Sequence, residues 1–147
     1  MSIELVFHLS TWGILPFWVL LAVSPHGLWT RRLVHSGLVP AAWALVYTGA
    51  LVLGLGTAEG GSFLSLGGVM ALFQAPLLAL TGWVHYVIFD LFIGAWEVRE
   101  ARRSGFRHAF VLPCLFLTLM AGPVGLLAFL ALRLGLRGAT PREEAGV

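Results

Sequence analysis

Long apolar stretches alternate with short polar segments along the whole chain. Four of these stretches are long enough to be membrane-spanning helices, because about 20 helical residues cross the hydrocarbon core of a bilayer. They cover residues 3–23, 40–56, 77–97 and 109–134. Proline and glycine, which commonly end helices, follow the first stretch in Ser24-Pro25-His26-Gly27. The pattern therefore predicts an all-α protein built as a four-helix integral membrane bundle.

A shorter apolar segment precedes the third span. Within residues 63–74, apolar side chains recur at helical spacing at Leu66, Val69, Met70 and Phe73. The segment is too short to cross a bilayer, so we predict a short interfacial or re-entrant helix before the third span. The alternative is a longer, tilted third helix that begins near Leu66.

The composition supports a membrane protein with one compact domain. Hydrophobic residues make up 59% of the 147 residues and charged residues 11%, with a mean hydropathy of +0.90. Soluble domains carry about 25% charged residues. We expect a single transmembrane domain over residues 1–136 and a flexible tail over residues 137–147, where charges, glycine and proline mix. Cys114 is the only cysteine, which excludes an intrachain disulfide and suits an apolar position in a helix.

The arginines predict an orientation in the membrane. Arg31 and Arg32 follow the first span and four arginines follow the third, within residues 99–107, whereas three lie after residue 132. Because cytoplasmic loops are rich in arginine and lysine, both termini are expected outside. The sequence starts without the basic region of a cleavable signal peptide or a plastid targeting segment, so the bacterial inner membrane is the expected location. No basic stripe with interleaved aromatic residues indicates nucleic-acid binding.

An aspartate and a histidine interrupt the third apolar stretch. Asp90 lies near its middle and His85 lies five residues earlier. An ionisable group at the bilayer centre costs at least about 2.5–3.5 kcal/mol, so such residues usually face the bundle interior and mark a working site. We therefore expect His85 and Asp90 to be sheltered together from the lipid, between the third and fourth spans. The alternative is structural, with Asp90 as a hydrogen-bonding group and His85 as an ordinary core residue.

Two further ionisable residues lie near the end of this span. Glu97 closes it close to the predicted cytoplasmic surface, and His108 precedes the fourth span on the same side. Carboxyl and imidazole groups act in general acid–base catalysis, so the candidate catalytic residues are His85, Asp90, Glu97 and His108. The alternatives are a solvated Glu97 paired with a loop arginine and an interfacial His108. Histidine and carboxylate ligands suit zinc or iron, so a metal held by these four residues stays an alternative. No metal is predicted, because the three- or four-residue spacing of helical metal ligands is absent.

Helical periodicity arranges the neighbours of these groups. Residues three, four or seven apart share a helix face. One face of the third span carries Trp83, Tyr86, Asp90, Gly94 and Glu97, and a second carries His85, Phe89, Phe92 and Trp96. In the fourth span Pro123 is expected to kink the helix, and Gly122 leaves room beside the kink. The candidate substrate-binding residues are Trp83, Tyr86, Phe89, Phe92, Gly94, Trp96, Thr118 and Gly122.

The third span resembles a known signature. Gly82-Trp83-Val84-His85-Tyr86 followed by Phe89-Asp90-Leu91-Phe92-Ile93-Gly94-Ala95-Trp96 is similar to the W-x-H-Y-x-x-F-D-L-F-x-G-x-W motif of the plant neoxanthin synthase family. These small membrane proteins are named for abscisic-acid deficiency, and their bacterial relatives have unassigned functions. Ile14-Leu15-Pro16-Phe17-Trp18 and Gly122-Pro123-Val124-Gly125-Leu126-Leu127 resemble the family's first helix and its later block. The likeness extends from Leu5 to Leu134.

The resemblance implies a reaction. Plant members act in making neoxanthin from violaxanthin, an isomerisation in which an epoxide opens and a proton leaves a neighbouring polyene carbon to give an allene. It needs an acid at the epoxide oxygen and a base at the carbon, roles that His85 and Asp90 could fill, and no cofactor. We therefore expect a membrane enzyme, such as an isomerase, that modifies a carotenoid or other isoprenoid substrate among the membrane lipids. The alternatives are a non-enzymatic carotenoid- or lipid-binding membrane subunit and an ion or proton conductor, although one buried acid does not make a relay.

Overall fold

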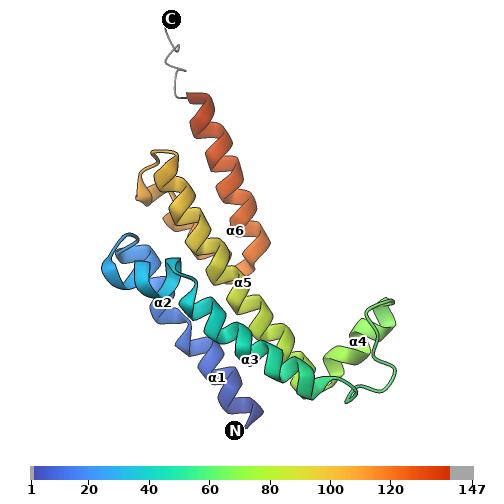
Figure 1. Cartoon of the computed structure of the whole chain (residues 1–147). Coiled ribbons are helices and arrows are strands. Elements are labelled where there is room, and N and C mark those ends of the chain that lie inside the picture. The colour runs from blue at the N-terminus through green and yellow to red at the C-terminus, as the bar shows by residue number, and fades with distance from the viewer. Residues whose placement is uncertain (1, 140–147) are drawn as a thin grey trace, which may run out of the picture. The chain divides into compact units, whose positions relative to one another are not determined.

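A computed structural model describes residues 2–139, and every regular element among them is a helix (Figure 1). The elements are α1 (Ile3–Gly13), α2 (Leu15–Val23), the π-helical segment η1 (Thr30–His35), α3 (Leu38–Gly54), α4 (Leu66–Gln74), α5 (Pro76–Arg103), the 3-10 turn η2 (His108–Phe110) and α6 (Leu112–Ala139). The all-α prediction is confirmed.

Three helical stretches in the described part of the chain are long and apolar enough to cross a membrane, not the four that were predicted. They are Ile3–Val23, Pro76–Arg103 and His108–Leu136. The missing one is α3, which has 17 residues. At 1.5 Å per residue it extends about 25 Å, less than the roughly 30 Å of a hydrocarbon core.

The side chains are sorted as a membrane protein requires. Large apolar residues cover the outside, and Leu45, Leu53 and Leu134 each expose more than 70% of their surface. The polar residues Ser10 and Thr30 are completely buried. This exterior would be costly in water, whereas lipid tails cover it without penalty.

The first apolar stretch is divided after Gly13. Pro16 has no backbone N–H to donate, and it stands in the first turn of α2, where such a donor has no helical partner. In the following loop, the buried Thr30 hydroxyl donates a 2.6 Å hydrogen bond to the Ser24 carbonyl oxygen.

The chain separates into two compact units, one up to Phe92 and one from Ile93 onward, and α5 contributes to both. In the first unit Val6 of α1 packs with Leu80, Val84 and Ile88 of α5, and Trp43 of α3 packs against this cluster. The single-domain prediction over residues 1–136 is not tested by this division.

The short helix before the third span is confirmed as a separate element. Ser65 caps α4 by accepting a 3.1 Å hydrogen bond from the Gly68 N–H. Ala75 then adopts an extended conformation, and Pro76 starts α5. The alternative, one long helix from Leu66, is therefore wrong, since the chain is interrupted between α4 and α5. The interfacial location of α4 stays a prediction.

In the second unit, α5 and α6 differ from the predicted third and fourth spans. The third helix was expected to end at Glu97 and continues to Arg103. The backbone of α6 leaves the helical conformation at Ala121 (φ −154°, ψ 52°) and Gly122 (φ 1°, ψ −75°), immediately before Pro123. A kink at Pro123 was predicted, and the helix is indeed interrupted there. The fourth span was nevertheless expected to be one kinked helix, whereas its backbone leaves the helical conformation at two residues. Helix α6 also extends to Ala139, into the predicted tail, whose residues 140–147 lie outside the described part.

Candidate functional site

Asp90 is a buried carboxyl group in the first unit. Its side chain is 8% exposed, and its carboxyl group accepts a hydrogen bond from the Tyr86 side chain, one helical turn earlier. Its second oxygen, Oδ2, is buried without a hydrogen-bond partner among the described residues. A buried polar atom without a hydrogen-bond partner destabilises the folded protein by about 1–3 kcal/mol, so its presence requires a physical reason.

Trp83, which lies on the same face of α5 as Asp90, links this face to α1. Its indole N–H donates a 2.9 Å hydrogen bond to Thr11 Oγ1, and the Thr11 hydroxyl donates to the Phe7 carbonyl oxygen at 2.8 Å. The Trp83 ring also contacts the rings of Phe7 and Tyr86, each at a centroid distance of 5.5 Å. The predicted stripe of Trp83, Tyr86 and Asp90 thus forms a continuous series of contacts. Thr11 was not among the predicted site residues, because its partner lies 72 positions away.

His85 lies elsewhere on α5, and the expectation that it shares a shelter with Asp90 is wrong. Its side chain is exposed, stacks on Phe89 at 4.5 Å and contacts Tyr47 of α3 at 5.8 Å. Five residues of α-helix correspond to a rotation of about 140°, which turns the two side chains to different sides.

His85 lines a groove of about 290 Å³ between α3, α4 and α5. Its other lining residues are Tyr47, Leu51, Phe63, Val69, Leu72, Phe73, Leu78, Thr81 and Gly82. The lining is apolar apart from Tyr47, Thr81 and His85. A groove of this character suits an apolar molecule that carries a single polar group.

Two other grooves border α5 in the first unit. Phe89 and Phe92, 54% and 49% exposed, line an apolar groove of about 330 Å³ with Pro40, Ala41, Ala44 and Ile88. Trp83 lines one of about 500 Å³ with residues of α1, including His8. None of these three grooves is lined by Asp90.

Glu97 forms the polar centre of the second unit. It has no exposed surface, and its Oε1 accepts a 2.9 Å hydrogen bond from the equally buried Thr118 hydroxyl of α6. The alternative of a solvated Glu97 is therefore wrong, because α6 covers this side chain. Cys114, four residues before Thr118 on α6, is also buried, with 5% of its surface exposed.

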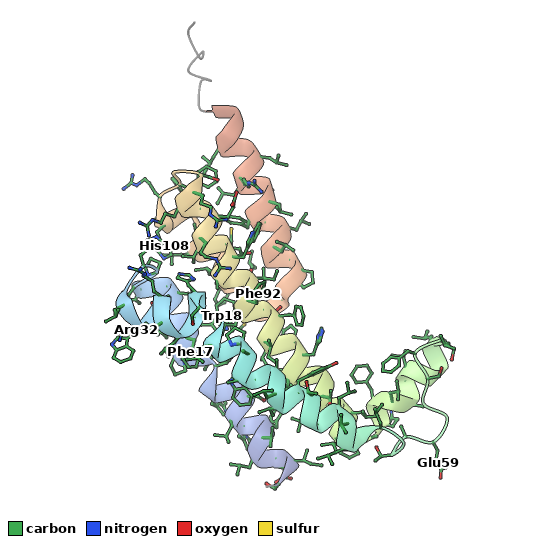
Figure 2. The ribbon with its side chains drawn as sticks, viewed as in Figure 1. Phe17, Trp18, Arg32, Glu59, Phe92 and His108 are labelled. Atoms are coloured by element: carbon green, nitrogen blue, oxygen red, sulfur yellow. The ribbon has the colours of Figure 1, made fainter. Side chains whose placement is uncertain are left out.

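The remaining candidates of this unit lie around the same helices. Trp96 meets Phe129 of α6 edge to face, with ring centroids 5.4 Å apart. Gly94 and Gly122 are buried, and Gly122 is one of the two non-helical residues of α6. His108 is partly buried in the 3-10 turn after α5 (Figure 2). Its predicted catalytic role stays a prediction, as do those of the other candidates.

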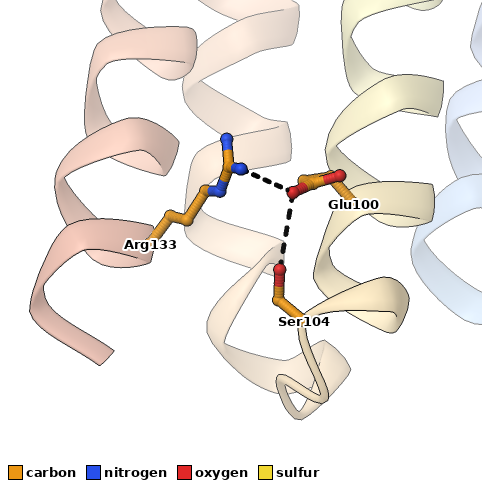
Figure 3. Close-up of polar contacts among 3 residues, drawn as sticks. All are labelled: Glu100, Ser104 and Arg133. Atoms are coloured by element: carbon orange, nitrogen blue, oxygen red, sulfur yellow. Dashed lines mark hydrogen bonds and ion pairs between the residues drawn. The ribbon is translucent and has the colours of Figure 1, made fainter. Parts of the chain in front are cut away.

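An ion pair that sequence reasoning missed joins α5 to the far part of α6. Arg133 Nη2 lies 2.9 Å from Glu100 Oε1, and the Ser104 hydroxyl donates to the same oxygen at 3.5 Å (Figure 3). The charge pattern alone offered several arginines as partners for the acids of α5 and gave no reason to prefer Arg133.

No group of three or more histidine, cysteine, aspartate or glutamate side chains within residues 2–139 is arranged to hold a metal ion. Two buried carboxyl groups among the described residues each have a hydroxyl partner: Asp90 with Tyr86, and Glu97 with Thr118.

Comparison with known proteins supports the resemblance seen in the motifs. Neither a curated protein nor a solved structure matches the chain significantly. The sequence model of the family described as ABA DEFICIENT 4-like matches residues 5–129, which include the Trp83–Trp96 motif and both buried carboxyl groups. The chain therefore belongs to the ABA DEFICIENT 4-like family.

Proposed function

We propose that this protein is a membrane-embedded enzyme that modifies a carotenoid or another long isoprenoid by acid–base chemistry. Family membership and the apolar helices are compatible with a carotenoid-related membrane protein. The observation that carries the proposal is the buried Asp90 carboxyl, which has one oxygen without a hydrogen-bond partner. Such an oxygen is available to accept a proton from a bound molecule.

The proposed reaction is an isomerisation that balances without an oxidant or a reductant. The carbon–oxygen bond of an epoxide breaks and the oxygen takes up a proton, while a carbon–hydrogen bond on a neighbouring polyene carbon breaks and releases one. Because the two positions are adjacent, the acid and the base must lie a few ångströms apart. Tyr86 and Asp90, which already share a hydrogen bond, meet this requirement better than His85 and Asp90.

In this proposal Asp90 accepts the proton from carbon, while the Tyr86 hydroxyl turns from Asp90 and gives its proton to the epoxide oxygen. The proton now on Asp90 then passes to the Tyr86 phenolate, which restores both groups. His85 forms the wall of the groove between α3, α4 and α5. Since Asp90 is buried and does not line the three grooves beside α5, substrate contact requires the side chains that cover it to move. Side-chain rotation of this kind is fast compared with typical turnover.

The test is turnover of violaxanthin by the purified protein in liposomes, followed by chromatography of the pigments. Wild-type protein is expected to form neoxanthin, and Asp90→Asn, which keeps the side-chain shape, is expected to form none while its thermal unfolding remains cooperative. Glu100→Gln is the matched control, a carboxyl-to-amide change on the same helix outside the proposed site. Product formation by Asp90→Asn at the wild-type rate would overturn the assignment of Asp90.

A second function, pigment binding without chemistry, is favoured by the groove that contains His85. Its apolar lining and single imidazole suit the end of an isoprenoid. Retention of pigment by wild-type protein with no turnover would support this function. In that case Leu51→Trp, which fills the groove, is expected to release the pigment. Leu53→Trp, on the same helix but 72% exposed, is expected to retain it.

A further inference from the structure

Helix α6 changes direction at its interruption. Contacts with α5 are made on both sides of Ala121 and Gly122: Thr118 before the interruption meets Glu97, and Phe129 and Arg133 after it meet Trp96 and Glu100. The second arm, from Pro123 onward, advances along α5 in the same direction as α5 itself, since 129 pairs with 96 and 133 with 100. The first arm enters from the loop after Arg103, so it must run the opposite way.

The arms pack closely just beyond the turn. A Cβ atom on Gly125 would lie 2.1 Å from the Thr118 backbone nitrogen and 2.1 Å from its hydroxyl oxygen. No side chain fits there, because real Cβ atoms do not approach backbone so closely. Gly125 is therefore the residue that allows the second arm to lie against the first.

The lengths of the arms match a partial insertion. The first arm, residues 112–120, extends about 14 Å, and residues 123–133 of the second extend about 17 Å. Each is about half of a hydrocarbon core of roughly 30 Å. Backbone groups released at a break within the membrane require partners in the protein. At this break Gly122 and Gly125 are buried, whereas Ala121 and Pro123 are exposed.

We propose that α6 is a re-entrant hairpin, which enters and leaves the membrane on the same face, so that the end of α6 lies on the same side as the loop after α5. The ion pair between Arg133 and Glu100 holds the returning arm at that level. If the loop after α5 is cytoplasmic, as the arginines predict, the end of α6 is cytoplasmic as well. This differs from the expectation that the C-terminus is outside.

The arginine distribution agrees with the hairpin. With a crossing α6, Arg133 would lie opposite the arginines at positions 99, 102, 103 and 107, against the usual asymmetry. With a hairpin, Arg133 joins them on one face. The hairpin also explains why Glu97 is buried although it is close to this charged face, since the first arm of α6 brings the Thr118 hydroxyl to it.

The test is labelling of single cysteines with a membrane-impermeant maleimide in oriented bacterial membrane vesicles. In a Cys114→Ala background, one cysteine replaces the exposed Arg107, and in a second protein one cysteine is added after the last residue. The hairpin predicts labelling of both from the same side of the membrane. Labelling from opposite sides would overturn it.

A variant pair tests the hairpin itself. Gly125→Leu is expected to separate the arms, whereas Gly135→Leu, where an added Cβ meets nothing within 4 Å, is expected to leave them together. The separation is read from a fluorescent donor and acceptor on cysteines at Arg107 and at the added C-terminal position, in full-length protein. If energy transfer between the two fluorophores is unchanged in a folded Gly125→Leu protein, Gly125 is not the residue that allows the arms to lie together. If this variant does not fold, the sidedness of labelling still decides the topology.

Discussion

The Thr118 hydroxyl donates a 2.9 Å hydrogen bond to Glu97, and neither side chain has any surface exposed. The two residues lie 21 positions apart, on α6 and α5. A carboxyl group inside a membrane protein is stable only when the protein supplies polar partners. The contact therefore fixes the first arm of α6 to α5 by a polar interaction that lipid cannot replace.

Thr118→Val is expected to destabilise the protein by about 1–3 kcal/mol, because it removes the donor and leaves the Glu97 carboxyl buried. Thermal unfolding in detergent micelles measures the effect. Thr48→Val is the control, since Thr48 is exposed on α3 and its hydroxyl bonds only its own helix, to Ala44. The double variant Glu97→Leu/Thr118→Val is expected to be more stable than Thr118→Val alone, because both polar groups are then absent. A single Thr118→Val variant as stable as wild type would show that the hydrogen bond does not contribute.

Trp83 and Thr11 are expected to be energetically coupled by about 0.6 kcal/mol, the average for hydrogen bonds between membrane helices. A double-mutant cycle with Trp83→Phe and Thr11→Val measures this coupling free energy through unfolding. The cycle removes the bond while each variant keeps most of the packing volume. Strictly additive effects would contradict a bond between the indole N–H and the threonine hydroxyl.

Local sequence signals predicted much of the helical content and little of the contacts between helices. The charged run from Glu97 to Arg103 was interpreted as the end of the third span, but glutamate, alanine and arginine all favour helix, and α5 continues through it. Pro123 predicted an interruption of α6, but a proline does not specify the direction of the chain after the break. For that reason the burial of Glu97 was missed.

The candidate site shows the same division. Spacing within one helix correctly grouped Trp83, Tyr86 and Asp90, since residues three and four apart are neighbours on a helix. It did not reveal Thr11 as a partner of Trp83, because that contact depends on how α1 and α5 pack. The five-residue separation of His85 and Asp90 indicates that the two side chains point to different sides of α5. Which of these sides is buried depends on how the neighbouring helices pack against α5.

Gly68→Ala is expected to destabilise the protein by about 1–3 kcal/mol, the usual range for overpacking. A Cβ atom at this position would lie 2.6 Å from both the carbonyl oxygen and the Cβ of Ser62, so backbone must shift. The adjacent Gly67→Ala is the control, because its Cβ meets nothing within 4 Å. It is expected to stabilise α4 by up to about 1 kcal/mol through helix propensity. Thermal unfolding of both variants checks the prediction, and equal effects of the two would contradict the packing of α4 against the preceding loop.

The Arg133–Glu100 ion pair is expected to contribute about 1 kcal/mol at low salt, near the upper end for surface pairs. The two side chains are 26% and 12% exposed, so solvent screens part of the attraction. A double-mutant cycle with Arg133→Met and Glu100→Gln measures the coupling. It is expected to decrease as the ionic strength is raised, since salt screens exposed charges. A coupling that does not change with salt would indicate a contact governed by packing.

Cys114 is expected to report on the closure of α6 over α5. Its side chain is 5% exposed and its thiol is directed to the Phe110 carbonyl oxygen at 3.9 Å, so a bulky maleimide has no access in the folded protein. Slow modification in native micelles and rapid modification after denaturation are therefore expected, measured by the mass of the intact chain. Thr118→Val is expected to accelerate modification, because it weakens the bond that holds the first arm of α6. Thr48→Val is expected to have no effect, since it lies on α3. Rapid modification of the folded wild-type protein would mean that this arm opens readily, and Glu97 would then be accessible to water despite its burial.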